Sequence, residues 1–210
     1  MSEERSAADL IDRDRYPIGD LDHPACQALI ARCRAELAAR QVCVVPGFLA
    51  PAALARMASD AEDVASRGYR RPGLRTCYVG SDPEPDWPED HPGRRLLVHK
   101  TRILAYDQIR GWPIDRLYRW PPLRGLVAAI LGKPKLYLHD CPYQALNLIA
   151  FAEGDQSSWH FDPDNEHTVT LLLQAAERGG EFEIAPRLRS ATDPAYDAVR
   201  NVLDGDRARV

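Results

Sequence analysis

The chain has 210 residues, 45% of them hydrophobic and 28% charged, which is the composition of an ordinary globular protein. A formal net charge of -4, with the basic residues scattered along the chain, argues against nucleic acid as a partner. No apolar run approaches the roughly 20 residues of a membrane span and residues 1–14 are too polar for a signal peptide, so we expect one cytoplasmic domain, residues 1–210, with no membrane partner.

The first 132 residues are predicted to be mainly helical, because apolar side chains recur there at helical spacing. Pro24 and Pro51 suit the first turns of two of the helices, and Gly132 suits the end of a third. Helices are predicted over 24–40, 51–66 and 122–131, and extended runs over 42–45, as a short buried strand, and over 96–106.

Residues 81–95 are predicted to form a loop, since four prolines among acidic residues block both helix and internal strand. The length of this loop leaves two interpretations open. It is either a lid over an active site or a plain excursion on the surface.

The five cysteines are predicted to be reduced thiols, because they are odd in number and widely spaced, without a Cys-x-x-Cys pair. Cys26 and Cys33 lie seven residues apart and therefore share one face of a helix, where we expect them to pack in the core. The others are Cys43, Cys77 and Cys141.

From residue 133 to residue 210 the pattern changes to short extended runs separated by turn residues, which is typical of a β domain. Glycine admits positive φ, so Glu177-Arg178-Gly179-Gly180 is predicted to be a hairpin turn. A helix is predicted again over 196–203. The extended runs are 136–138, 144–152, 157–161, 167–174 and 181–185.

Trp159-His160-Phe161-Asp162 is the segment with the clearest chemistry. In an extended chain, side chains two residues apart project from the same face, so His160 and Asp162 can converge on one cation while Phe161 points away. An imidazole and a carboxylate are two of the three ligands of the 2-His-1-carboxylate iron(II) site. His-x-Asp is also common by chance, and a hydrogen-bonded pair on the surface is the alternative.

The flanking residues are more specific than the pair itself. Phe151-Ala-Glu-Gly-Asp-Gln-Ser-Ser-Trp-His-Phe-Asp is followed by His167-Thr-Val-Thr-Leu-Leu-Leu-Gln and then by Gly179-Gly-Glu-Phe-Glu-Ile-Ala-Pro. This order resembles the iron(II)- and 2-oxoglutarate-dependent oxygenases, and within them a bacterial branch of amino-acid hydroxylases and radical halogenases. The resemblance covers roughly 137–210, with weaker similarity over 44–49 and 122–132.

This resemblance implies an α+β fold, in which N-terminal helices pack around a double-stranded β-helix, or jelly roll, with the metal at its open end. His160 and Asp162 would bind iron(II), and Asn147 would form a wall of the 2-oxoglutarate pocket. The implied reaction is hydroxylation of a small polar substrate, such as an amino acid or a natural-product intermediate, with O2. Halogenases generally carry a small residue in place of the carboxylate, so Asp162 favours hydroxylation over halogenation; desaturation is a further alternative.

Two residues that the resemblance implies are missing from the 210 residues. The family has a second histidine beyond the Gly-Gly-Glu-Phe segment, followed by an arginine for the distal carboxylate of 2-oxoglutarate. His167 lies too close to Asp162 to be that ligand, so we expect a C-terminal portion with further strands to follow Val210. Substitution by His99 or His139, or a jelly-roll module that binds without catalysis, are the alternatives.

Four further residues are candidates for contacts with the substrate, each with a plainer alternative. Trp159 either supports the metal site or packs in the core. Asp164 either contacts the substrate or only forms a turn, as aspartate often does. Arg102, two residues from Lys100, and Arg189, two residues from Arg187, either bind an anionic group or lie on solvated surfaces.

Overall fold

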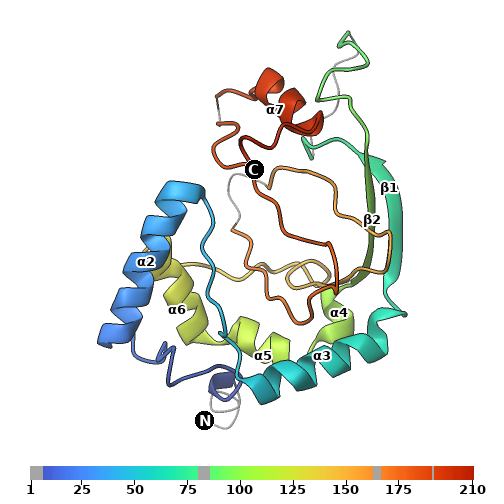
Figure 1. The fold of residues 1–210 in the computed structure, drawn as a ribbon. Coiled ribbons are helices and arrows are strands. Elements are labelled where there is room, and N and C mark those ends of the chain that lie inside the picture. Colours follow the sequence, from blue (N-terminus) through green and yellow to red (C-terminus); the bar gives the residue numbers. More distant parts are fainter. Residues whose placement is uncertain (1–6, 80–85, 163–166, 191) are drawn as a thin grey trace. The chain divides into compact units, whose positions relative to one another are not determined.

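The computed structural model describes residues 7–79, 86–162, 167–190 and 192–210. The chain divides into two compact units, one formed by Met1–Gly68 with Ile103–Ile149 and the other by Tyr69–Arg102 with Ala150–Val210. The helices and strands are α2 (Pro24–Arg40), α3 (Pro51–Ala65), β1 (Tyr69–Arg75), β2 (Leu97–Leu104), α4 (Tyr106–Ile109), α5 (Pro113–Arg119), α6 (Pro121–Ile130), β3 (Leu148–Ala150) and α7 (Tyr196–Leu203). Figure 1 labels each of them except β3.

The first unit is built mainly from helices. Helices α2, α3, α5 and α6 each begin with proline, whose fixed φ and missing N–H suit the first turn. The predicted core face of α2 is confirmed, since Cys26 and Cys33 are fully buried. Arg34 of α2 donates two hydrogen bonds to the carbonyl of Ala129 near the end of α6, where a cation also complements the helix dipole.

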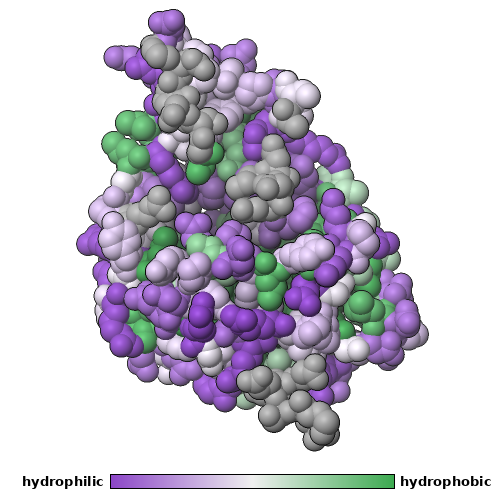
Figure 2. Space-filling view, turned by 180° about the vertical axis from the view of Figure 1, so that it is seen from behind, coloured by the Kyte–Doolittle hydropathy of each residue, from purple (hydrophilic) through white to green (hydrophobic). Residues whose placement is uncertain are grey.

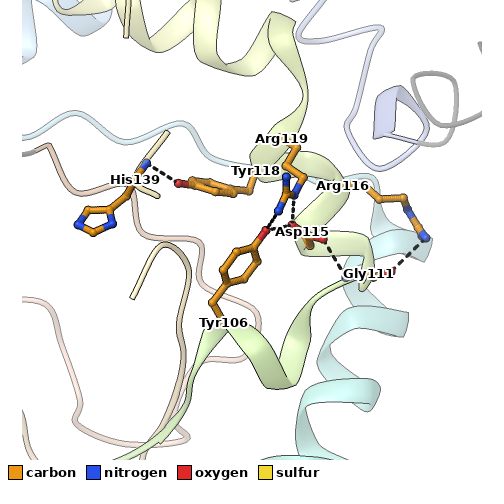
Figure 3. Close-up of polar contacts among 7 residues, drawn as sticks. All are labelled: Tyr106, Gly111, Asp115, Arg116, Tyr118, Arg119 and His139. Atoms are coloured by element: carbon orange, nitrogen blue, oxygen red, sulfur yellow. Dashed lines mark hydrogen bonds and ion pairs between the residues drawn. The ribbon is translucent and has the colours of Figure 1, made fainter. Parts of the chain in front are cut away.

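A buried carboxylate, that of Asp115 in α5, organises the polar interior of the first unit. It accepts hydrogen bonds from the Tyr106 hydroxyl at 2.7 Å, the Gly111 N–H at 2.8 Å and Arg119 Nε at 2.8 Å. Figure 3 shows these groups converging, with the Arg119 guanidinium also on the Tyr106 hydroxyl. Burial acts to raise the pKa of Asp115, but the hydrogen bonds from Gly111, Tyr106 and Arg119 outweigh it and hold the pKa below its ordinary value.

The second unit contains β1, most of β2 and a small apolar core. The sheet has the strand order β1-β2-β3, and an antiparallel bridge joins Lys100 of β2 to Gln156. Helix α7 contributes Val199 and Val202 to a buried cluster with Cys77 and Leu188. This cluster lies under the chain segment that carries the His-x-Asp pair, because Trp159 and Phe161 pack against it.

Several runs predicted as strands are not strands in the structure. Residues 42–45, 136–138, 157–161, 167–174 and 181–185 lie outside helices and strands, and of 144–152 only 148–150 form one. A strand needs a hydrogen-bonded neighbour, which an apolar pattern does not guarantee. Val169, Leu172 and Phe182 are accordingly 66%, 70% and 77% exposed. Figure 2 shows one face of the molecule, with hydrophobic residues in small groups among hydrophilic ones.

The predicted hairpin turn and loop are seen in part. Gly179 and Gly180 both have positive φ, at 70° and 74°, as expected of the turn, but the runs on either side are not paired strands. Of the loop predicted over 81–95, residues 86–95 contain no helix or strand, and 81–85 lie outside the described residues. None of the helices in the described ranges is long and apolar enough to cross a membrane.

Replacing Asp115 by alanine is expected to lower the free energy of unfolding by about 3 kcal/mol, because three donors lose their acceptor. The folded-state pKa of Asp115 is lowered, so its contribution is present above the unfolded-state pKa and is lost as pH falls through the folded-state pKa. Urea unfolding at about pH 7 and about pH 3 measures both effects. Asp107→Ala, at an exposed position of α4, is the control; equal losses in the two variants would contradict the role of Asp115.

Candidate functional site

The His160 and Asp162 side chains lie on the same face of an extended segment, as the alternation of side chains predicts. His160 Nε2 is 3.5 Å from Asp162 Oδ1, and the two side chains are 36% and 52% exposed. Phe161 points the other way, into the cluster that contains Cys77, and its N–H donates to the Cys77 carbonyl at 2.9 Å. The segment is therefore fixed on its apolar side and open on the side that carries the two candidate ligands.

A backbone carbonyl determines which nitrogen of His160 is available. His160 Nδ1 lies 2.8 Å from the Ser158 carbonyl oxygen. A carbonyl can only accept, so Nδ1 carries the proton and, in the neutral imidazole, Nε2 keeps its lone pair. That lone pair faces the Asp162 carboxylate. When the imidazole is protonated, the same 3.5 Å contact becomes the surface ion pair that is the plainer interpretation of His-x-Asp.

Asp162 is oriented by its own neighbours. Thr168 Oγ1 donates to Asp162 Oδ2 at 3.0 Å, while the other carboxylate oxygen, Oδ1, faces His160. The Arg189 guanidinium donates to the Asp162 backbone carbonyl at 3.2 Å. It also lies 4.5 Å from the centre of the Phe161 ring, a cation–π contact. Arg189 therefore holds both the backbone and the aromatic side of the segment and brings positive charge to it.

Ser158 is buried at 6% exposure and joins the segment to the sheet. Its hydroxyl accepts a hydrogen bond of 2.8 Å from Arg75 Nε at the end of β1. Its N–H donates to Nδ1 of the buried His99 in β2 at 3.3 Å. With its carbonyl on His160, all three polar groups of Ser158 have partners. This residue thus links both strands to the candidate ligand.

The other predicted site residues are distributed as follows. Trp159 packs partly buried against the Cys77 cluster, as the core interpretation predicts. Asn147 belongs to the first compact unit, whereas His160 belongs to the second. Asp164 lies outside the described residues. Arg102 has a buried Nε without a hydrogen-bond partner among the described residues, and no described polar contact brings it to the His-x-Asp pair.

Each of the proposed substitutes for a third ligand uses its Nδ1 to accept a backbone N–H. His99 Nδ1 accepts the Ser158 N–H, and His139 Nδ1 accepts the Cys141 N–H at 3.0 Å within the first unit. Across the described ranges, no group of three or more His, Cys, Asp and Glu side chains is arranged to hold a metal ion. The described residues therefore supply two converging ligand atoms. Ser158, Thr168 and Arg75 are the residues of this site that the sequence pattern did not single out.

In comparisons with known proteins, no protein-family model, no curated protein and no solved structure matches the chain.

Ser158→Ala is expected to lower the free energy of unfolding by about 1 kcal/mol, because the hydrogen bond from Arg75 Nε to a buried hydroxyl is lost. Urea unfolding measures the change. Ser157→Ala is the matched control, since the neighbouring serine is exposed and should change stability by less than about 0.5 kcal/mol. If both variants unfold at the wild-type urea concentration, Ser158 does not anchor the segment.

Proposed function

We propose that the protein is an iron(II)- and 2-oxoglutarate-dependent hydroxylase of a small polar substrate, such as an amino acid or a natural-product intermediate. The observation that carries the proposal is the approach of His160 Nε2 to Asp162 Oδ1, with the second imidazole nitrogen on the Ser158 carbonyl. Histidines that bind metals almost always donate their other ring N–H to such an acceptor. The resemblance of the surrounding motif to this superfamily supports the same function.

The two side chains fit part of an iron(II) site. A neutral imidazole nitrogen and a carboxylate oxygen are ligand types of the 2-His-1-carboxylate triad. Both side chains are at least one-third exposed, so a cation and small co-substrates can reach them. The third ligand, the arginine for 2-oxoglutarate and the role of Asn147 in its pocket follow from the resemblance alone and stay predictions.

Each residue has a distinct role in this proposal. Bound iron would supply the oxidation of a substrate C–H bond, coupled to conversion of 2-oxoglutarate and O2 into succinate and carbon dioxide. Ser158 keeps the proton on His160 Nδ1, so that Nε2 is free to bind. Thr168 orients the Asp162 carboxylate. The Arg189 guanidinium beside the segment suits an anionic group of the substrate or co-substrate.

The carboxylate of Asp162 also bears on the type of oxidation. A halogenase needs a vacant position on iron for chloride, and a carboxylate ligand would occupy that position. Asp162 therefore supports hydroxylation over halogenation, and product analysis in the presence of chloride separates the two. A chlorinated product would overturn this part of the proposal.

Replacing His160 or Asp162 by alanine is expected to reduce the affinity for Co(II), which is used in place of iron(II). The reduction should exceed the roughly 10- to 100-fold that follows when a residue hydrogen-bonded to a metal ligand is lost. Isothermal titration calorimetry measures the affinity. The same variants should lose the succinate that the wild-type protein forms from 2-oxoglutarate with iron(II) and a panel of amino acids.

His167→Ala is the matched control, because this histidine is exposed and lies close along the chain to the motif. It should keep both the Co(II) affinity and the succinate yield of the wild-type protein. Equal Co(II) binding by the wild-type protein and the His160→Ala variant would count against the metal site, whatever the turnover assay gives.

A second candidate function is a non-catalytic binding module that uses the same pair. It is favoured by the finding that the described residues bring only two ligand atoms together and no cluster of three. Such a module would bind Co(II) weakly through His160 and Asp162 but form no succinate with any member of the panel. Metal binding without turnover distinguishes it from the hydroxylase.

A further inference from the structure

The chain reverses direction at the end of α2. Gln41, directly after Arg40, has left-handed backbone angles, φ 57° and ψ 13°, and its N–H donates to the Leu37 carbonyl at 2.9 Å. A left-handed residue at this position ends a helix and turns the following chain back. The residues after Gln41 are thereby directed toward the turns of α2 that precede them.

Two residues of α2 hold the returning chain in place. Arg32 donates to the Val44 carbonyl at 3.0 Å and also to Glu36 Oε1 at 2.8 Å. The other Glu36 oxygen accepts the Val44 N–H at 3.4 Å. Both backbone groups of Val44 are therefore attached to the stretch of α2 that contains Cys33.

This arrangement brings two cysteine thiols together. Val44 is 63% exposed, whereas Cys43 before it is partly buried and Cys33 is fully buried on the inner face of α2. The Cys43 thiol lies close enough to Cys33 to be one of the groups that raise the Cys33 pKa, and both are free cysteines. The two residues are ten apart in sequence, a spacing that matches no short dithiol motif.

We propose that Cys33 and Cys43 are a redox modification site, at which an intramolecular disulfide forms by exchange with a low-molecular-weight disulfide of the oxidised glutathione type. This inference is independent of the proposed oxygenase function, because it involves none of the residues of the His-x-Asp site. The contacts that place the pair all lie within the first compact unit.

The exposure of the two thiols sets the order of the exchange. The Cys43 thiolate attacks one sulfur of the small disulfide and releases one thiol, which leaves a mixed disulfide on Cys43. The Cys33 thiol then loses its proton to water, its sulfur attacks the Cys43 sulfur, and the second small thiol leaves. In total, two protein thiols are oxidised to one disulfide and one small disulfide is reduced to two thiols.

The second step is expected to be the slower one. Burial, followed by the neighbouring Cys43 thiol, raises the pKa of Cys33 to about 12. Only the thiolate is nucleophilic, so few Cys33 side chains are reactive at neutral pH. The mixed disulfide on Cys43 should therefore accumulate transiently before the internal disulfide forms.

The test incubates the reduced, folded chain with oxidised glutathione, blocks the remaining thiols by alkylation and maps tryptic peptides without reduction. The expected product joins the dipeptide Cys33-Arg34 to peptide 41–56, and the number of free thiols falls by two from the initial five. The oxidised chain should melt about 5 °C higher, because the new bond constrains the unfolded state.

Two serine variants separate this site from other thiol chemistry. Cys33→Ser should stop at a stable glutathione adduct on Cys43. Cys26→Ser is the matched control, at another buried position on the same face of α2, and should form the disulfide as the wild-type chain does. A wild-type product that ends at the adduct, links Cys33 to another cysteine or keeps all five thiols would overturn the proposal; the wild-type mapping decides this even if a variant does not fold.

Discussion

The candidate site depends on how one buried residue satisfies its polar groups. Ser158 is almost fully buried, and a buried N–H, carbonyl or hydroxyl without a partner costs about 1–3 kcal/mol. Its hydroxyl and N–H are partnered by Arg75 and His99 from two strands, and its carbonyl is partnered by His160. Because the same residue needs all three contacts, the register of the segment against the sheet and the orientation of the imidazole are fixed together.

The helices were predictable because helix formation is local. Helices α2 and α7 have the predicted bounds, 24–40 and 196–203, since hydrogen bonds between near neighbours and terminal residues such as Pro24 determine them. The extended runs were predicted less well. Residues 167–174 have a strand-like apolar pattern, yet pairing depends on a distant segment, and the described part of the chain gives them no partner strand. The jelly roll itself stays a prediction.

The same distinction applies to the site. The convergence of His160 and Asp162 followed from a spacing of two in an extended chain, and the burial of Phe161 from the same alternation. The roles of Ser158, Arg75 and Thr168 did not follow from spacing, because each contact joins residues that the pattern does not relate. A small polar residue two positions before a candidate ligand histidine was the one available signal. That Ser158 is buried, and so needs partners for its polar groups, is a property of the fold and cannot be read from the spacing.

Cysteine spacing shows how a local rule can miss a pair. Two thiols on one helix meet only at separations of three or four residues, and a Cys-x-x-Cys search detects only such pairs. Cys33 and Cys43 are brought together by a chain reversal at Gln41 and by the bonds from Arg32 and Glu36 to Val44. A non-glycine residue in the left-handed conformation is uncommon, and neither composition nor periodicity indicates it. The reactivity of a cysteine pair therefore has to be inferred from the path of the backbone after the helix as well as from the spacing of the cysteines.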